Sequence, residues 1–230
     1  MLNGGWLSKR LPHGNLLLSL NTLYFAYGPD CNVTGAPLEQ LEWLGALLQS
    51  ANASGQRVVI SGHIPPDMWL PRCRAWYAQM CVENAQTIRG QIFGHKHSDQ
   101  FNFLNVDGVV NSPNLSPATT IAITCAPSVV PSFNPSFRVW KYDPSSMDLG
   151  GYVQFYADLD RWYRNGGPGF DKEYSLMDAY GLSGNPSNVD FWITFKRLLT
   201  TNTTMCAQYL KFFCVSVTGA VPEVCKQATC

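Results

Sequence analysis

Short apolar runs and one amphipathic segment alternate at the start of the chain. The runs at 14–20 and 57–61 are continuous and rich in Leu, Val and Ile, which predicts two buried strands. Between them, leucines recur at helical spacing after Pro37 and stop before Gly55, which predicts a helix. A strand, a helix and a second strand in this order are typical of a layered α/β unit.

The pattern predicts further elements along the rest of the chain. Residues 22–27 are expected either to extend the first strand or to form a second one. A helix is expected at 74–88, and strands are expected at 91–93, 101–106, 119–124, 137–142 and 152–157. From residue 172 onward the chain reads as mostly helical, with helices at 174–180, 188–199 and 205–215. The predicted organisation is therefore an α/β body over 1–127 followed by an appendage over 128–230.

Composition narrows the class of protein. The chain has 230 residues, 46% of them hydrophobic and 14% charged, which is sufficient to bury a substantial core. Its formal net charge is zero and it has no basic patch, so nucleic acid is not an expected partner. No apolar run approaches the ~18 residues of a membrane span, so no transmembrane segment is expected.

Cysteines and sequons indicate an oxidising environment. The chain has eight cysteines, and it has Asn-x-Ser/Thr sequons at Asn32, Asn52, Asn114 and Asn202. Together they favour a secreted or lysosome-like glycoprotein; a cytosolic protein with free thiols is the alternative. No signal peptide is expected at the start of the chain, because its apolar run covers only 16–20 and a signal needs about 7–15 apolar residues. A chain without its true N-terminus would explain both observations.

Three of the four histidines lie in two segments with a Gly-His pair. His63 follows the run at 57–61, and His95 and His97 follow a shorter apolar run. Imidazole is a good ligand for Zn, Fe or Mn when its other nitrogen is held by a neighbour. Asp99 is the candidate for that role, and a backbone carbonyl is the alternative. In extended backbone, His95 and His97 would point the same way. We therefore expect a metal site; surface or core histidines, and Asp99 as a loop cap, are the alternatives. His13, in a Pro-His-Gly turn, is expected to be structural.

Several motifs carry a family resemblance. They are SGHIPP at 61–66, FGHKHSDQF at 93–101, QLEWL at 40–44, and APS at 126–128 with NPSFRV at 134–139. These motifs resemble the calcineurin-like metallophosphoesterases, and more narrowly the acid sphingomyelinase group with its sphingomyelinase-like phosphodiesterases. The resemblance implies the second half of a four-layer α/β sandwich, followed by a mostly helical, disulfide-bonded C-terminal domain.

The resemblance also implies a two-zinc site. His63 and His95 would be ligands of one zinc ion and His97 of the other, and a metal-activated water would attack the phosphorus of sphingomyelin or a related phosphodiester. It places a disulfide between Cys31 and Cys73. The last four cysteines, Cys206, Cys214, Cys225 and Cys230, are expected to pair among themselves, and Cys81 and Cys125 are unassigned.

The remaining motifs of the family do not occur in this sequence. Its Asp-x-His, Gly-Asp-x-x-Asp and Gly-Asn-His motifs supply the bridging carboxylate, the Asn ligand and the leaving-group acid, so no catalytic residue is assigned here. Two Zn²⁺ ions repel strongly without a shared anion. We therefore expect an N-terminally truncated chain that lacks the first half of its domain, is inactive alone and folds poorly, because strands 16–20 and 58–61 would lose neighbours.

Two alternatives to a zinc phosphodiesterase differ from it in class of protein or in substrate. One is a non-catalytic secreted glycoprotein, a relic of the enzyme; the other is an endopolyphosphatase-like hydrolase. The substrate, lipid or soluble, cannot be read from the motifs. Aromatic residues of the appendage are expected to pack in the core rather than to face lipid; they are Trp140, Tyr142, Phe155, Tyr156, Trp162 and Tyr163.

Overall fold

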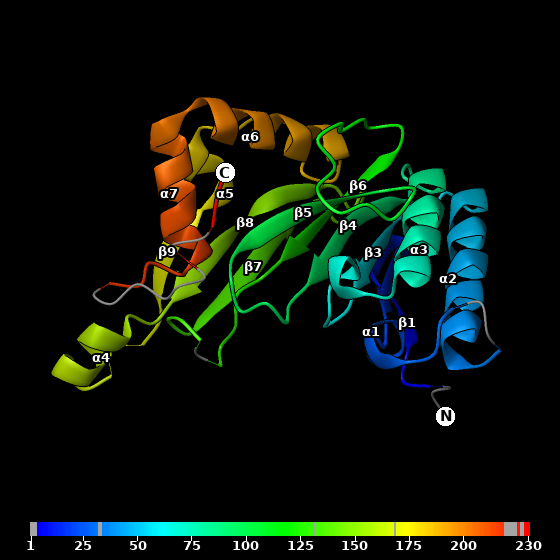
Figure 1. The fold of residues 1–230 in the computed structure, drawn as a ribbon, viewed down its shortest axis with the longest axis horizontal. Coiled ribbons are helices and arrows are strands. Elements are labelled where there is room, and N and C mark those ends of the chain that lie inside the picture. The colour runs from blue at the N-terminus through cyan, green and yellow to red at the C-terminus, as the bar shows by residue number, and fades with distance from the viewer. Residues whose placement is uncertain (1–3, 32–33, 131, 168, 219–224, 226–227) are drawn as a thin grey trace.

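A mixed six-stranded sheet forms the centre of the fold (Figure 1). The computed structural model describes residues 4–31, 34–130, 132–167, 169–218, 225 and 228–230. In chain order the strands are β1 (Leu7–Arg10), β2 (Leu16–Ser19), β3 (Val58–Ser61), β4 (Ile88–Phe93), β5 (Gln100–Asn105) and β6 (Thr120–Cys125). Their spatial order is β1-β2-β3-β4-β6-β5, with the four inner strands parallel and both edge strands antiparallel.

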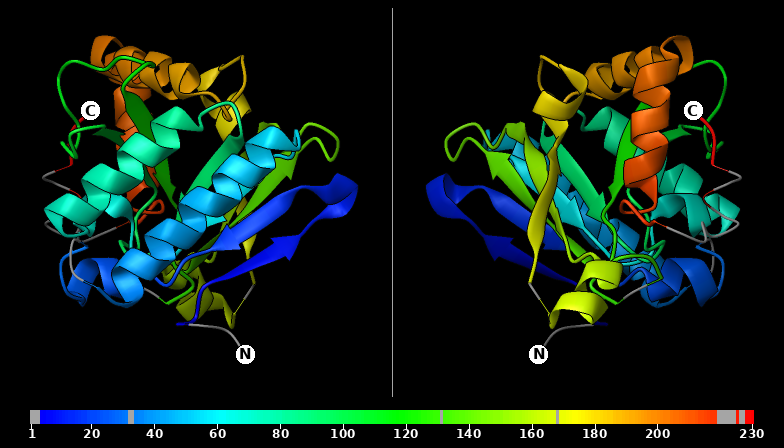
Figure 2. Two further views of the ribbon diagram at one scale, coloured as in Figure 1. Left: turned by 90° about the vertical axis from the view of Figure 1, so that its right-hand side faces the viewer. Right: turned by 90° about the vertical axis from the view of Figure 1, so that its left-hand side faces the viewer.

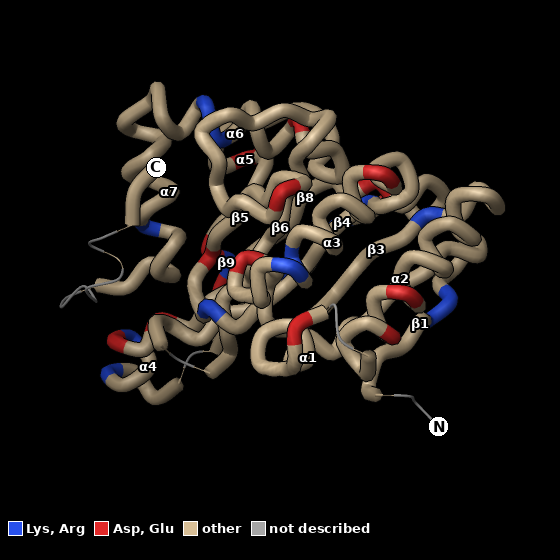
Figure 3. The backbone as a smooth tube through the Cα atoms, turned by 45° about the vertical axis from the view of Figure 1, so that its right-hand side comes forward, with Lys and Arg blue, Asp and Glu red and all other residues tan. Residues whose placement is uncertain are grey.

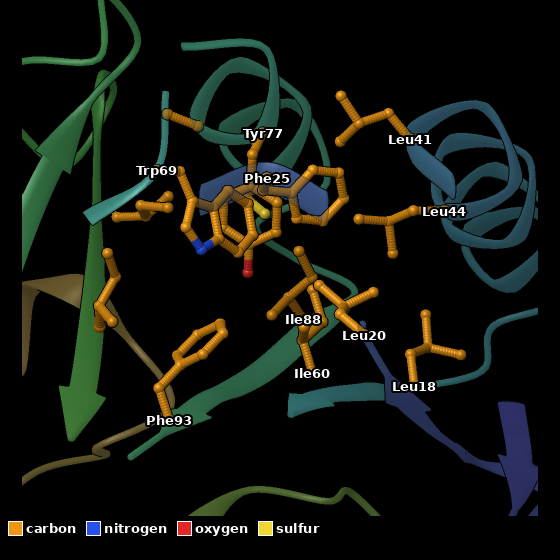
Figure 4. Close-up of a cluster of buried hydrophobic side chains, with 14 of the residues drawn as sticks. Leu18, Leu20, Phe25, Leu41, Leu44, Ile60, Trp69, Tyr77, Ile88 and Phe93 are labelled. Atoms are coloured by element: carbon orange, nitrogen blue, oxygen red, sulfur yellow. The ribbon is translucent and has the colours of Figure 1, made fainter. Parts of the chain in front are cut away.

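Two long helices cover one face of this sheet (Figure 2). They are α2 (Ala36–Ala53) and α3 (Pro71–Glu83), and each begins with a proline in its first turn. Leu44 of α2 and Tyr77 of α3 are fully buried in one cluster with Ile60 of β3 (Figure 4). The β-branched strand β3 thus occupies the centre of the sheet, as its sequence predicts.

A second, three-stranded antiparallel sheet lies against the other face. It contains β7 (Ser136–Tyr142), β8 (Leu149–Tyr156) and β9 (Asp171–Ser175). Gly90 of β4 marks the contact between the two sheets, because a Cβ there would lie 2.8 Å from Leu149 Cδ1. The α/β class is therefore confirmed, with a helical layer, a six-stranded sheet and a second sheet.

The C-terminal part is mostly helical. It contains α4 (Leu159–Asn165), α5 (Leu176–Tyr180), α6 (Val189–Thr201) and α7 (Thr203–Phe213). Phe103 of β5 belongs to the same buried cluster as Phe195 of α6 and Phe212 of α7. Hydrophobic packing is therefore continuous across the proposed boundary between 127 and 128.

The segment expected to be a strand at 22–27 contains a helix, α1 (Leu23–Tyr27), with Thr22 at its N-cap, so the prediction is wrong. A short apolar run does not distinguish the two by its periodicity, so tertiary contacts decide. Phe25 is fully buried against Trp69, with ring centroids 4.4 Å apart, and its carbonyl accepts a hydrogen bond from the Leu70 amide. These contacts with the segment just before α3 fix the position of Phe25 in the helix.

Two other boundaries differ from the predicted ones. The helix expected at 74–88 ends at Glu83, and Ile88 already belongs to β4. Strand β9 occupies 171–175 in the region expected to be helical, because pairing with β8 overrides the weak local preference of this segment. The strand β1 and the helix α4 have no counterpart among the predicted elements.

Strand β1 changes the expectation about exposed edges. It pairs with β2 along its length, from Leu7 with Ser19 to Arg10 with Leu16, and β3 pairs with the other side of β2. The prediction that strand 16–20 lacks a neighbour is therefore wrong for the described structure. Lys9 and Arg10 are exposed on this edge strand, where charged side chains discourage pairing with another chain.

Three disulfides are formed. Cys31 pairs with Cys73, as the resemblance implied, and the last four cysteines pair as Cys206–Cys230 and Cys214–Cys225. The remaining thiols, Cys81 and Cys125, are buried, and burial raises the pKa of each to about 12. Such thiols are unreactive, so both residues are part of the packing.

The aromatic residues of the appendage do not all enter the core. Trp140 packs edge-on against buried Tyr152. In contrast, Tyr142, Trp162 and Tyr163 are exposed, Tyr163 by 81%, so the prediction of core packing is wrong for these three. Trp162 and Tyr163 lie on α4, which projects from the body in Figure 1.

The structure also shows where the sequons and the charged residues lie, and whether any helix could span a membrane. Asn52, Asn114 and Asn202 are exposed, while Asn32 lies outside the described residues. Lys and Arg are interspersed with Asp and Glu along the tube in Figure 3. Among the helices of the described segments, none has the length and hydropathy needed to cross a bilayer.

We predict that Ile60→Ala lowers the free energy of unfolding by about 2–5 kcal/mol, because it leaves a cavity beneath two helices. Urea denaturation measures the change. Val109→Ala is the matched control, since Val109 is 48% exposed and its truncation should cost less than about 0.5 kcal/mol. Equal effects of both changes would contradict the central position of β3.

Candidate metal site

His63 and His95 lie just beyond the carboxyl ends of the adjacent parallel strands β3 and β4. Gly62 is needed for this approach, because a Cβ there would lie 2.6 Å from Thr22 Cγ2 and 2.9 Å from the Phe93 ring. At Gly94 the nearest atom to such a Cβ is 3.8 Å away. The expectation that glycine permits a close turn therefore holds for Gly62 and has no steric basis at Gly94.

The two imidazoles face each other. His63 Nε2 lies 3.1 Å from His95 Nδ1, and the ring planes are nearly perpendicular at 85°. Two nitrogens on one tetrahedral zinc ion, each about 2.0–2.1 Å from the metal, are separated by about 3.3–3.4 Å. The pair therefore fits two ligands of a single ion.

Both imidazoles are accessible, and the surroundings of His95 favour its neutral form. His63 is exposed and His95 is half-buried, so an ion can reach both from solvent. Burial, followed by the nearby His63, His97 and Lys96, lowers the pKa of His95. The neutral imidazole is the form that binds a metal.

His97 points elsewhere. Its Nδ1 lies 2.8 Å from Ser132 Oγ, in the loop that precedes β7. His95 and His97 both have left-handed backbone, with φ of 69° and 58°. The expectation of extended backbone with both side chains on one side is therefore wrong, and the two imidazoles have different partners. Such conformations cost of order 1–3 kcal/mol each and are concentrated at functional sites.

Asp99 has a different role from the expected one. Its carboxylate accepts hydrogen bonds from Arg138 Nη2, at 2.5 Å, and from the Tyr174 hydroxyl, and it makes none to an imidazole within the described part of the chain. Its backbone amide donates to the carbonyl of Phe213, at the end of α7, at 2.9 Å. Asp99 therefore anchors the histidine loop to the second sheet and to the C-terminal helices.

Arg138 is the residue that the sequence did not single out. It lies in the NPSFRV segment, and its partner Asp99 is 39 residues earlier in the chain. The side chains of Arg138 and Asp99 are 2% and 5% exposed, and the guanidinium lies 3.7 Å from the centroid of the Tyr152 ring. A buried Arg normally needs such partners. A charged residue inside the predicted strand 137–142 was the only feature of the sequence that could have indicated this ion pair.

The buried network continues from Arg138 to Glu173. Gln154 accepts from Arg138 Nη2 at 2.7 Å and donates through Nε2 to Glu173 at 2.7 Å. Ser216, beyond α7, donates to the other Glu173 oxygen at 2.7 Å. Burial raises the pKa of Glu173 to about 7.

The described residues hold no group of three or more His, Cys, Asp or Glu side chains that could bind a metal ion. The candidate site is therefore limited to the His63–His95 pair, whose nitrogens lie 3.1 Å apart. In open α/β sheets, ligands bind beyond the carboxyl ends of the strands, which is where these two imidazoles lie.

Comparisons with known proteins identify the family. The profile of the acid sphingomyelin phosphodiesterase C-terminal region matches residues 108–230. The chain is 30% identical over 193 residues to acid sphingomyelinase-like phosphodiesterase 3b of Mus musculus, which covers 77% of this chain and 42% of the relative. It is 26% identical over 232 residues to sphingomyelin phosphodiesterase A of Dictyostelium discoideum, covering 97% of this chain and 38% of the relative. Against the cyclic GMP-AMP phosphodiesterase SMPDL3A of Homo sapiens the identity is 27% over 241 residues, covering 97% and 52%.

The chain belongs to the acid sphingomyelinase-like family of phosphodiesterases, within the metallophosphoesterases. It spans about half or less of the length of the curated relatives that it matches.

We predict that Glu173→Gln stabilises the protein at pH 8 but not at pH 4.5. A carboxyl whose folded pKa is raised from 4.5 to about 7 destabilises the fold as the pH rises through this window. The penalty is of order 3 kcal/mol above pH 7. Urea denaturation at both pH values measures the difference.

The matched control for this pH dependence is Glu42→Gln, which removes an exposed carboxyl from α2. Its effect should not grow between pH 4.5 and 8. A Glu173→Gln effect that is equal at both pH values would show that burial does not disfavour the Glu173 carboxylate.

Proposed function

We propose that this chain forms the histidine side of a two-zinc site in a secreted phosphodiester hydrolase. The observation that carries the proposal is the 3.1 Å separation of His63 Nε2 and His95 Nδ1 at the ends of adjacent strands. His63 and His95 would hold one zinc ion. His97 would bind the second through Nε2, because its Nδ1 is held by Ser132.

A phosphodiester is the proposed substrate class. The relatives' names refer to sphingomyelin and to cyclic GMP-AMP, and both molecules contain phosphodiester bonds. When bound, zinc would supply Lewis acidity toward the phosphoryl group and an activated water. This chain's own residues would place the ions: His63 and His95 from their strand ends, and His97 through its bond to Ser132.

Activity is proposed to need acidic ligands beyond those in this chain. Three neutral imidazoles supply no negative charge to screen two divalent cations. The family's bridging carboxylate would provide that charge, and no described residue groups with the histidines to do so. The three disulfides and the exposed Asn52, Asn114 and Asn202 support a glycosylated protein of an oxidising compartment.

We predict that zinc binds to this chain through His63 and His95 together. Imidazole ¹⁵N spectra recorded during a zinc titration should show both residues shifting with one midpoint, while His13, in its exposed turn, serves as an internal control. His63→Ala should raise that midpoint at least tenfold, because one of two ligands is lost. A midpoint that the substitution leaves unchanged would refute the shared site.

We also predict that the purified 230-residue chain does not hydrolyse a chromogenic phosphodiester in the presence of zinc. The reason is the missing anionic bridge between the ions. The measurement is the release of nitrophenolate from bis(p-nitrophenyl) phosphate at saturating zinc. Turnover that disappears in His63→Ala would overturn this part of the proposal and would show that the chain completes its own site.

A further inference from the structure

An ion pair links the two loops that carry the histidines. Lys96, between His95 and His97, donates through Nζ to the carboxylate of Asp67, four residues after His63. The Asp67 side chain is 6% exposed and the Lys96 side chain 22% exposed. An ion pair with this burial is a stronger constraint than one in solvent.

Lys96 is the only cation that pairs with Asp67 among the described residues. Asn102 Nδ2 lies 3.4 Å from the same oxygen, Oδ2, and Oδ1 is buried without a hydrogen-bond partner. The Asp67 carboxylate therefore depends on Lys96 for its charge balance. Removing the cation alone would leave a buried charge uncompensated.

The backbone adds a second link at the same place. The Gly94 amide donates to the His63 carbonyl at 3.0 Å, and the Lys96 amide donates to the Gly94 carbonyl at 2.8 Å. The residues on both sides of Lys96 have left-handed backbone, which persists only where the surroundings hold it. The Lys96 side chain holds the middle of this loop to the loop of His63.

We propose that Asp67 and Lys96 are positioning residues, which fix the loop of His95 against the loop of His63 so that the two imidazoles share one metal ion. The role assigned to them is not that of a ligand: the Lys96 ammonium pairs with Asp67 Oδ2, and Asp67 Oδ1 is buried. The inference rests on the proposed zinc site for its metal readout. The ion pair should also keep the two imidazoles in contact when no metal is bound.

A double-mutant cycle tests the pair. The variants are Asp67→Asn, Lys96→Met and the double substitution, with Lys96→Arg as the conservative variant. Zinc affinity is measured from the ¹⁵N shifts of His63 and His95, and the contact between the two rings is measured without metal from their nuclear Overhauser effect. Thermal unfolding of each variant separates a loss of position from a loss of fold.

We expect Asp67→Asn to weaken zinc binding about tenfold and to remove the ring contact while the protein stays folded. The double variant should be no weaker than Asp67→Asn, because the two residues act as a unit, and Lys96→Arg should bind nearly as well as the unchanged protein. If Lys96→Met does not fold, Asp67→Asn and Lys96→Arg carry the test. The matched control is Arg72→Met, which breaks an exposed ion pair with Asp30 at 3.7 Å and should leave both readouts unchanged.

The outcomes separate this inference from the proposed function. Zinc that does not shift His63 and His95 in the unchanged protein would refute the zinc site, and the metal-free ring contact would then decide the positioning role. Zinc affinity and a ring contact that survive Asp67→Asn would overturn the positioning role and leave the zinc site in place.

Discussion

The buried pair of Asp99 and Arg138 is the interaction on which the arrangement of the site depends. Asp99 ends the loop that carries His95 and His97, and Arg138 comes from the second sheet. Each of these charges would be costly in the interior without the other. The pair therefore obliges the second sheet and the histidine loop to fold together.

The network around this pair extends the constraint to the C-terminus. Tyr174 of β9 bonds to Asp99, and Ser216 bonds to Glu173 at the far end of the same network. Ser216 follows Cys214, which is held by a disulfide to Cys225. Through these contacts the C-terminal region holds the histidine loop in place. The same region also packs continuously against the α/β body.

The histidine loops are held from the other side by the central sheet. The ends of β3 and β4 bring His63 and His95 within 3.1 Å, and the tight packing around Gly62 fixes where the first loop leaves its strand. Strain at His95 and His97 is sustained by these supports. Among the described residues, no acidic side chain forms a metal-binding group of three or more with these imidazoles.

Periodicity and local motifs were sufficient to predict the α/β class, the central strand β3, the helix α2 and the histidines at strand ends. Other features depend on contacts that form only in the folded molecule. Residues 22–27 became a helix because Phe25 packs against Trp69, and β9 formed because β8 pairs with it. Asp99 became an anchor because Arg138, distant in sequence, reaches it. Contacts between distant segments set these outcomes, and a local pattern does not encode them.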